Sequence, residues 1–393
     1  MTTDIIVIGG GVIGSAIAYN LTKRGKRVVL LEKKYLVNGA SGACDQGILL
    51  QSKAPGDHLR LGIYSMEMYK GLEKELSREL EFSQKGYLVL IENDMELKTM
   101  EDVVKQQNAC GLPSQIISAD EAMRLQPGLN RDAIVAAAYC PWDGEVNPYM
   151  TTFAYADRAA ELGAVIRTGC PVTGLMIENG QVKGVKTPEE VIYGETVINA
   201  AGAWAPFIGQ MAGLEIPIKP RRGQVYITEA VPQFVHKGVI NARYIVAKHH
   251  PELLKNDTSK KAKLGVGISL TQSFKGNVLF GASREFVGYD TSNTLEGLKE
   301  VMANATHLVP GLKRLNIIRT MGGLRPYPPD SKPLIGYVKG LPGFFMAAGH
   351  EGDGISLAPA TGKLVADLIL DGRTDVPAAA SFDVNRFDLM KNG

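Results

Sequence analysis

A glycine-rich turn near the start of the chain has the residue types and spacing of a dinucleotide-phosphate site. Gly9, Gly11 and Gly14 form the pattern G-x-G-x-x-G, and Glu32 follows 18 residues after the last glycine. Glycine permits a tight turn, a close approach of the backbone to a pyrophosphate, and close packing of a helix on a strand. An acidic residue at that distance is placed to accept hydrogen bonds from a ribose. These residues predict a dinucleotide site.

The segments around this turn have the pattern of a strand, a helix and a second strand. Residues 4–8 and 28–31 are short runs of Ile, Val and Leu, typical of buried parallel strands, and residues 13–24 form a helix that Gly25 ends. Because the helix begins at the glycines, its free N–H groups and positive dipole end would face the phosphates. The structural alternative is an ordinary strand–helix turn followed by an incidental glutamate.

Composition limits the class of protein. The 393 residues are 45% hydrophobic, which is enough for two domains. A net charge of +2, from 43 Lys and Arg against 41 Asp and Glu, argues against nucleic acid or a polybasic membrane surface as the main partner. The cysteines form no C-x-x-C pair, so we expect no metal site and a reducing, cytoplasmic location. Neither a signal peptide nor a transmembrane helix is expected.

Helices and buried strands alternate over the first two hundred residues and again near the end of the chain. Ser118 and Glu121 form a capping box before a short helix that ends near Pro127, and Asn147 with Pro148 begins another. Apolar spacing predicts helices over residues 59–80, 148–163, 294–308 and 356–370. Short apolar runs predict strands over residues 86–92, 164–168, 196–200 and 343–348, and a hairpin over residues 172–186.

The region between residues 222 and 285 has an antiparallel pattern. Alternating side chains predict strands over residues 222–229, 244–248, 265–270 and 277–284. Residues 248–263 are dense in charge and turn residues, so we expect a solvated excursion, with contact to a partner as the alternative. Residues 322–335 are expected to be a proline-rich crossing segment.

Six blocks stand in a fixed order along nearly the whole chain. They are G-G-G-V-I-G, G-A-S-G-A-C-D-Q-G, Y-C-P-W-D-G-E-V-N-P, N-A-A-G-A-W, G-G-L-R-P-Y-P-P-D-S-K-P-L-I-G and A-A-G-H-E-G-D-G-I-S-L-A-P-A-T-G-K-L. Together they resemble the D-amino-acid-oxidase-like family of FAD-dependent amine oxidoreductases. Within that family they are similar to glycine oxidase, sarcosine oxidase β subunits, and the β-type subunits of proline, opine and hydrogen-cyanide-forming dehydrogenases. The G-L-R-P and G-H-x-x-x-G-I blocks are more specific than the glycine-rich turn.

This resemblance implies an α/β fold with two domains. The first is a Rossmann-like FAD-binding domain of glutathione-reductase-like topology, assembled from residues 1–82, 141–220 and 322–393. The second is an inserted antiparallel-sheet α+β substrate domain, made of residues 83–140 and 221–321.

The resemblance also implies which residues hold FAD. An Asn usually stands near Asp45 in relatives, so this chain departs from the family there. The implied residues are Gly9, Gly11, Val12, Ile13, Gly14, Glu32, Lys33, Ala40, Ser41, Asp45, Gln46, Gly47, Val172, Ala201, Gly202, Trp204, Gly349, Gly352, Asp353, Gly354 and Ile355. Because residues 322–326 lack the cysteine that attaches flavin in monomeric sarcosine oxidases, we expect noncovalent FAD.

Three residues are implied on the substrate side. Arg325 matches the arginine that holds the substrate carboxylate in glycine oxidase, and a guanidinium suits that task because it binds carboxylates bidentately. The alternative is a structural ion pair. Tyr244 matches a pocket tyrosine, or packs on the sheet, and His350 lies near the flavin, or is a hydrogen-bonded core histidine. Gly352 replaces a second arginine of glycine oxidase, so substrate preference should differ.

The implied function is oxidation of the C–N bond of an amino acid or secondary amine by hydride transfer to flavin N5. We expect the catalytic β-type subunit of a multi-subunit dehydrogenase, in a hetero-oligomer with electron-transfer subunits or a homo-oligomer. It would be cytoplasmic, and a partner would bring it to a membrane. The alternatives are a stand-alone oxidase of glycine, sarcosine or D-amino acids that reduces O₂ to hydrogen peroxide, an NAD-dependent dehydrogenase, and a non-catalytic FAD scaffold.

Overall fold

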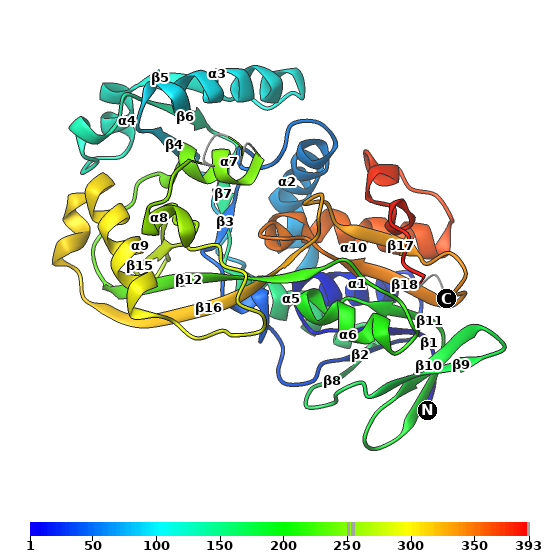
Figure 1. Cartoon of the computed structure of the whole chain (residues 1–393). Coiled ribbons are helices and arrows are strands. Elements are labelled where there is room, and N and C mark those ends of the chain that lie inside the picture. The colour runs from blue at the N-terminus through cyan, green and yellow to red at the C-terminus, as the bar shows by residue number, and fades with distance from the viewer. Residues whose placement is uncertain (250–251, 253–255, 391–393) are drawn as a thin grey trace.

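Two large β-sheets organise the described part of the chain, which comprises residues 1–249, 252 and 256–390 of this computed structural model. In Figure 1, the first sheet and helices α1, α5 and α10 form one lobe, and the second sheet with α3, α4, α7 and α9 forms the other. Strands β12 and β16 extend between the lobes. Within the described residues, no helix is both long and apolar enough to cross a bilayer.

The first sheet has the strand order β17-β18-β11-β1-β2-β8, with the β9–β10 hairpin attached to β11. The strands from β18 to β8 are parallel, and β17 is an antiparallel edge strand. Asn179 and Gly180 close the hairpin with positive φ. The strands are β1 (Thr2–Ile8), β2 (Val28–Leu31), β8 (Val165–Arg167), β9 (Gly174–Glu178), β10 (Gln181–Lys186), β11 (Val191–Asn199), β17 (Leu334–Tyr337) and β18 (Phe344–Ala348).

Helices cover one face of the first sheet. Alternate residues of β1, such as Ile5 and Val7, point into this helical layer, whereas Ile6 and Ile8 point to the other face, where β10 and α6 pack. Asn147 Oδ1 caps α5 by accepting from the Tyr149 and Met150 N–H groups, as predicted. The helices are α1 (Val12–Lys23), α2 (Asp57–Leu76), α5 (Pro148–Glu161), α6 (Ala205–Gln210) and α10 (Gly354–Leu370).

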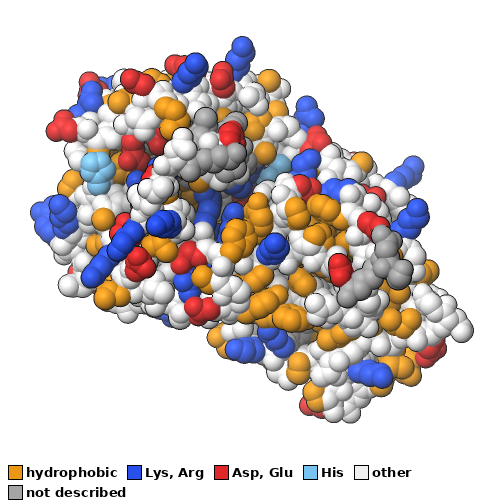
Figure 2. Space-filling model, in the orientation of Figure 1, with side chains coloured by type: hydrophobic (Ala, Val, Ile, Leu, Met, Phe, Trp, Pro, Cys, Tyr) orange, Lys and Arg blue, Asp and Glu red, His pale blue; other side chains and the backbone are white. Residues whose placement is uncertain are grey.

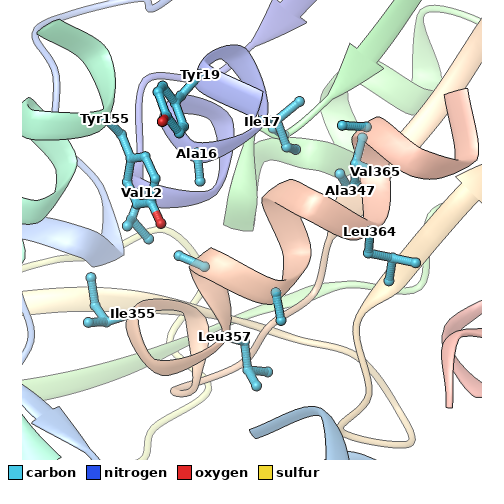
Figure 3. Packing of buried hydrophobic residues seen from close by; sticks show 14 of the residues in the cluster. Val12, Ala16, Ile17, Tyr19, Tyr155, Ala347, Ile355, Leu357, Leu364 and Val365 are labelled. Carbon is cyan, nitrogen blue, oxygen red and sulfur yellow. The ribbon is translucent and has the colours of Figure 1, made fainter. Parts of the chain in front are cut away.

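Helices α1 and α10 pack closely because small side chains lie between them. A Cβ added to Gly362 would lie 2.8 Å from the Ala16 carbonyl oxygen. Figure 3 shows Ala16 and Ile17 of α1 facing α10, which carries Leu364 and Val365. This packing holds the N-terminal ends of both helices at the carboxyl edge of the sheet.

The second sheet has the order β16-β12-β15-β14-β13-β4-β6-β5. Its pairs are antiparallel except β13 with β4, which are parallel. The strands are β4 (Tyr87–Ile91), β5 (Gln115–Ser118), β6 (Ala136–Cys140), β12 (Lys219–Ala230), β13 (Gly238–Asn241), β14 (Ser269–Gln272), β15 (Asn277–Gly281) and β16 (Ile317–Tyr327), and β3 (Gly47–Ile48) pairs with β7 (Gly144–Glu145) in a third small sheet.

Helices cover both faces of the second sheet. Residues of α3 and α7 pack on one face, and residues of α4 and α9 pack on the other. The helices are α3 (Asp94–Ala109), α4 (Ala119–Leu125), α7 (Ala242–His249), α8 (Lys260–Lys263) and α9 (Leu295–Leu308). Short 3₁₀ turns are η1 (Ala40–Gly42), η2 (Arg131–Ala133), η3 (Gly202–Trp204), η5 (Pro310–Arg314), η6 (Ala379–Phe382) and η7 (Val384–Arg386).

The strand predicted over residues 244–248 is wrong, because this segment belongs to α7. Ala242, Ile245 and Val246 are all buried, and their spacing fits one helical face as well as a short buried strand. Strand β13 ends at Asn241, where the chain leaves the sheet and α7 packs over the β4 side. A short apolar run fits both the helical and the strand spacing, and tertiary packing decides which one forms.

Two further expectations change. The proline-rich crossing segment is wrong for its first part, since β16 pairs with β12 along residues 317–327 and accommodates Pro326 in an edge strand. Lys248 does not belong to a solvated excursion, because its side chain is buried. Residues 250, 251 and 253–255 of that excursion lie outside the described residues. The two-domain division stays a prediction, and β16 runs across its expected boundary at residue 322.

Candidate functional site

A deep cleft lies at the carboxyl ends of the parallel strands of the first sheet. Its lining includes Ile8, Leu31 and Ala348, which end β1, β2 and β18, and Gly223 and Gly323, which belong to β12 and β16 of the second sheet. It holds about 1600 Å³ of space between atoms, including its opening to solvent. The carboxyl edge of an open parallel sheet is where α/β proteins bind ligands.

The glycine-rich turn forms one end of this cleft. Gly9 has φ +118°, and a Cβ there would lie 2.5 Å from the Ala200 carbonyl oxygen. A Cβ on Gly14 would overlap the Gly9 carbonyl oxygen, whereas one on Gly11 would meet only Ser41 Oγ, at 3.2 Å. Gly9 and Gly14 are therefore required by the turn itself, and Gly11 leaves the backbone bare toward the cleft. This is the cradle that a pyrophosphate needs.

Glu32 directly follows the second strand of this unit and lines the cleft. Its Oε2 accepts a hydrogen bond from the Gly10 N–H at 2.8 Å, and its Oε1 accepts from the Lys34 N–H at 2.9 Å. The carboxylate thus holds the turn in place. A bound ribose would donate to the same carboxylate oxygens as these two N–H groups. The ammonium of neighbouring Lys33 lies 3.9 Å from the centre of the Trp204 ring, and burial lowers its pKa.

The loop after the second strand passes along the cleft floor. Ser41 Oγ accepts from the Val12 N–H at 3.0 Å, which ties the loop to the first turn of α1. The Asp45 carbonyl accepts from Thr271 Oγ1 at 2.8 Å, which ties the loop to the second sheet. Cys44, which the sequence did not single out, also lines the cleft, and burial raises its thiol pKa to about 12.

Most residues expected to hold the cofactor line this one cleft. The exceptions are Gly14, Gln46, Gly47 and Asp353. The lining residues are Gly9, Gly11, Val12, Ile13, Glu32, Lys33, Ala40, Ser41, Asp45, Val172, Ala201, Gly202, Trp204, Gly349, Gly352, Gly354 and Ile355. A bare glycine turn, an acid at the second strand and an apolar floor fit a dinucleotide such as FAD, although the role of each residue stays a prediction.

Arg325 lines the same cleft from β16. Its Nη1 donates to the Ser283 carbonyl at 3.0 Å. The guanidinium lies over Gly223 on the paired strand β12, and any Cβ at that position would overlap it. The absence of a side chain at residue 223 therefore makes room for Arg325, a requirement that G-L-R-P alone does not reveal.

Tyr244 and Gly352 complete the substrate side of the cleft. A Cβ on Gly352 would lie 3.4 Å from Arg325 Cδ and 3.9 Å from the Tyr244 hydroxyl oxygen, so Gly352 lies between these two side chains. The Tyr244 ring stacks on the Arg284 guanidinium at 3.6 Å, and Arg284 Nη1 donates to the Tyr244 carbonyl at 2.9 Å. No sequence motif points to Arg284. An anionic group in the space beside Gly352 would face the Arg325 guanidinium, with Tyr244 on the other side.

His350 lines the cleft, but its ring faces the core. Its Nε2 lies 3.1 Å from Thr361 Oγ1 of α10, within hydrogen-bond distance. Burial lowers the pKa of His350 to about 3, so the imidazole is neutral at physiological pH. This geometry fits the alternative of a hydrogen-bonded core histidine, and a role for His350 beside the flavin stays a prediction.

A buried network of charges lies behind the substrate side, and the sequence did not predict it. The Glu351 carboxylate pairs with Arg221 and lies 3.8 Å from Lys248 Nζ. Asp353 accepts from Lys248 Nζ at 2.8 Å and from Lys53 Nζ at 3.0 Å. The two acids are visible in H-E-G-D-G, but their basic partners come from segments up to 300 residues away.

These contacts shift the pKa values of the acids and lysines. Burial alone would raise the pKa of Glu351 and of Asp353, but the nearby positive charges outweigh it and hold both carboxyls below their usual range. Burial lowers the pKa of Lys53, whereas Asp353 and Glu351 raise that of Lys248 above its usual value despite burial. Both acids are therefore ionised, and Asp353 faces lysines, not the cleft.

Comparisons with known proteins agree with this geometry. The family model described as DAO, FAD dependent oxidoreductase, matches residues 4–368. Hydrogen cyanide synthase subunit HcnC of Pseudomonas aeruginosa is 27% identical over 94% of this chain and 92% of its own length. Mitochondrial dimethylglycine dehydrogenase of Rattus norvegicus is 30% identical over 94% of this chain, but this chain spans only 43% of that protein.

Solved structures share the whole fold. L-proline dehydrogenase from P. horikoshii matches with a TM-score of 0.87 and 35% identity, over 98% of each chain. Glycine oxidase from Geobacillus kaustophilus matches with a TM-score of 0.87 and 26% identity, over 98% of this chain and 99% of its own.

These matches confirm the expected fold class, a Rossmann-like FAD-binding domain with a sheet-rich second domain. They also confirm that the chain is an oxidoreductase and that its cofactor is FAD. With the family model matching most of its length, the chain belongs to the DAO family of FAD-dependent oxidoreductases.

Proposed function

We propose that this protein oxidises the C–N bond of an amino acid or related secondary amine, as the catalytic subunit of a dehydrogenase. The observation that carries the proposal is Arg325, which lines the same cleft as the glycine-rich turn and lies beside Tyr244 and Gly352. A guanidinium in a partly buried cleft is suited to a carboxylate, which it binds with two parallel hydrogen bonds. FAD, when bound, supplies the hydride acceptor.

The residues of this chain bind and orient the substrate. Arg325 would hold the carboxylate, and Tyr244 would bound the opposite side of the pocket, so that the substrate C–N bond is directed toward the cofactor end of the cleft. The substrate loses a hydride from carbon and a proton from nitrogen. Its product is an imine, which water hydrolyses to a carbonyl compound and an amine or ammonia. No described side chain is needed as a base at carbon.

The turn that opens α10 would favour reduction of the cofactor. Gly354 begins α10 and Gly352 precedes it, and both line the cleft. The N–H groups at the start of a helix and its positive dipole end stabilise negative charge nearby. The 17-residue length of α10 and its packing on α1 fix that end rigidly. This turn is therefore suited to stabilise the charge that a hydride brings.

The dehydrogenase form of the proposal rests on two supports. The match to L-proline dehydrogenase has the higher identity of the two structures described above, and HcnC is by its name a subunit of a synthase. A small aromatic cluster also adjoins the cleft lining. Trp204 of the lining contacts Tyr289, and Tyr289 contacts Phe207, with exposed fractions of 38% for Tyr289 and 45% for Phe207. Figure 2 shows hydrophobic side chains gathered near the centre of the visible face. A cytoplasmic electron-transfer subunit is the partner that we propose.

A stand-alone oxidase is the second candidate, favoured by the likeness to glycine oxidase. The two forms differ in what reoxidises the reduced flavin. We expect an artificial dye to reoxidise the reduced protein rapidly in stopped flow and O₂ to do so slowly. Fast reoxidation by O₂ with stoichiometric hydrogen peroxide would instead establish the oxidase.

The role of Arg325 is tested with matched substrates. In anaerobic flavin reduction, Arg325→Ala should slow the best amino acid by about 30-fold or more and the corresponding decarboxylated amine little. Loss of one partner of a buried charged pair costs about 2–5 kcal/mol, and Arg325→Lys should also be impaired because it lacks the fork. If both substrates slow equally, Arg325 supports the fold or the flavin instead.

A further inference from the structure

We propose that Lys248 is a positioning residue. It locks α7 to the turn that opens α10, which holds Tyr244 in place and thereby sets the affinity of the enzyme for its substrate. The inference deepens the proposed function and rests on it. Its basis is a buried ion pair between Lys248 Nζ and Asp353 Oδ2, 2.8 Å apart, with the lysine side chain 1% exposed and the aspartate 6% exposed.

Tyr244 and Lys248 are four residues apart on α7, so they lie on the same face of the helix. Tyr244 lines the cleft, and Lys248 reaches past it to the turn that carries Glu351, Gly352 and Asp353. Ala242 and Ile245 of α7 pack on the second sheet, and Tyr244 is partly buried against the same cluster. The helix is thus clamped between its sheet and the cofactor-side turn, and Lys248 makes the second of these contacts.

Asp353 is a fixed anchor for this clamp. Its Oδ1 accepts from Lys53 Nζ at 3.0 Å, and Lys53 also donates to the Leu49 carbonyl and to Ser356 Oγ, at 2.8 Å each. The Lys53 side chain is fully buried, and Ser356 belongs to the first turn of α10. The aspartate therefore stays in place through Lys53 when Lys248 is changed, so the two lysines have separable effects.

At the Tyr244 end, α7 is held by contacts weaker than a buried ion pair. These contacts are the stacked Arg284 guanidinium and its hydrogen bond to the Tyr244 carbonyl. A helix of eight residues has little stability of its own, so its placement depends on such tertiary contacts. Without Lys248, only the sheet and Arg284 hold α7, and we expect the helix to tilt away from Gly352. The space between Tyr244 and Arg325 would widen, while the glycine-rich turn at the far end of the cleft would be untouched.

The variant Lys248→Met keeps the length of the side chain and removes its charge. In the holoenzyme, we expect the amino-acid concentration that half-saturates anaerobic flavin reduction to rise about 10-fold or more, with the limiting rate changed by less than about 3-fold. FAD content should equal that of the parent. Lys261→Met, a lysine of α8 near Glu92, is the matched control and should change neither value.

Hydrogen exchange gives a readout that does not depend on activity. Amides of residues 242–248 should exchange faster in Lys248→Met than in the parent, and those of α1 should not change. If Lys248→Met does not fold, Lys248→Gln, which keeps a donor, takes its place with the same expectations at smaller size. Unchanged exchange over α7 in a folded variant would overturn the proposal, even if no amine reduced the flavin and the proposed function had failed.

A double-mutant cycle tests the route through Tyr244. If Lys248 acts by placing Tyr244, then Lys248→Met should raise the half-saturating concentration much less in a Tyr244→Ala background than in the parent. Additive effects of the two changes would overturn the assignment of Lys248 as a positioning residue for Tyr244.

Discussion

At the scale of residues, the substrate side depends on two glycines as much as on Arg325. Gly223 leaves the space that the guanidinium occupies, and Gly352 leaves the space between the guanidinium and Tyr244. Both spaces are created by missing side chains, so they are invisible to a search for charged or aromatic residues. The geometry predicts different outcomes for the same substitution at the two positions.

Gly223→Ala should displace Arg325 without unfolding the protein. The added Cβ would overlap the guanidinium, which is the far end of a flexible side chain and can move, unlike backbone. We expect weaker binding of the amino-acid substrate, by about 10-fold in the half-saturating concentration, and little effect on the decarboxylated amine. Gly352→Ala is the comparison, since its Cβ would make contacts of 3.4–3.9 Å and leave the guanidinium in place. Equal effects of both variants would contradict this explanation.

At the scale of elements, sequence patterns predict the segments that form the glycine-rich end of the cleft and the start of α10. The strand at residues 2–8, helix α1 and helix α10 follow directly from their apolar runs and glycines. The helix α3 was not predicted, and α7 was predicted as a strand. Both helices pack over the same face of the second sheet. Strands far away in the sequence bury their apolar residues there, so the local pattern does not reveal these helices. Lys248 was misassigned for the same reason, because its partner Asp353 lies 105 residues away.

The contact between His350 and helix α10 gives a prediction for pH dependence. Burial lowers the pKa of His350 to about 3, against about 6.5 in an unfolded chain. Between these values the unfolded state binds more protons, so the contribution to stability is complete above pH 6.5 and is lost as the pH falls. From this group alone, the free energy of unfolding should fall by up to about 1.4 kcal/mol per pH unit below 6.5.

Denaturant unfolding of the holoenzyme at fixed FAD concentration, between pH 7.5 and 4.5, checks this expectation. His350→Gln can still pair with Thr361 but does not titrate, so its stability should fall less steeply than that of the parent. Parallel curves for the two proteins would mean that His350 is not buried in its neutral form.

At the scale of the whole molecule, the cleft exists only because the two sheets meet. The first sheet contributes the glycine-rich turn and the start of α10, and β12, β16 and α7 contribute the substrate side. The sequence could predict the first set because its residues are close together in the chain. It could predict the second set only through a resemblance, since Tyr244, Arg325 and Gly352 come from three different segments.

The whole cleft also predicts that FAD is held noncovalently. Cys44, in the loop after the second strand, lines the cleft together with Cys170, and burial raises the pKa of Cys44 to about 12, which makes that thiol a poor nucleophile. Acid precipitation of the purified protein should leave a yellow supernatant and a colourless pellet. A pellet that stays yellow after washing would show a covalent bond.

The central claim is that an amino acid or secondary amine reduces the FAD of this protein. Anaerobic titration of the flavin absorbance with proline, sarcosine, glycine, opines and D-amino acids tests it directly, with dithionite as the control for full reduction. We predict that at least one carboxylate-bearing amine bleaches the flavin to the dithionite end point and that its decarboxylated counterpart does so far more slowly. A flavin that dithionite bleaches and that none of these amines reduces would contradict the claim.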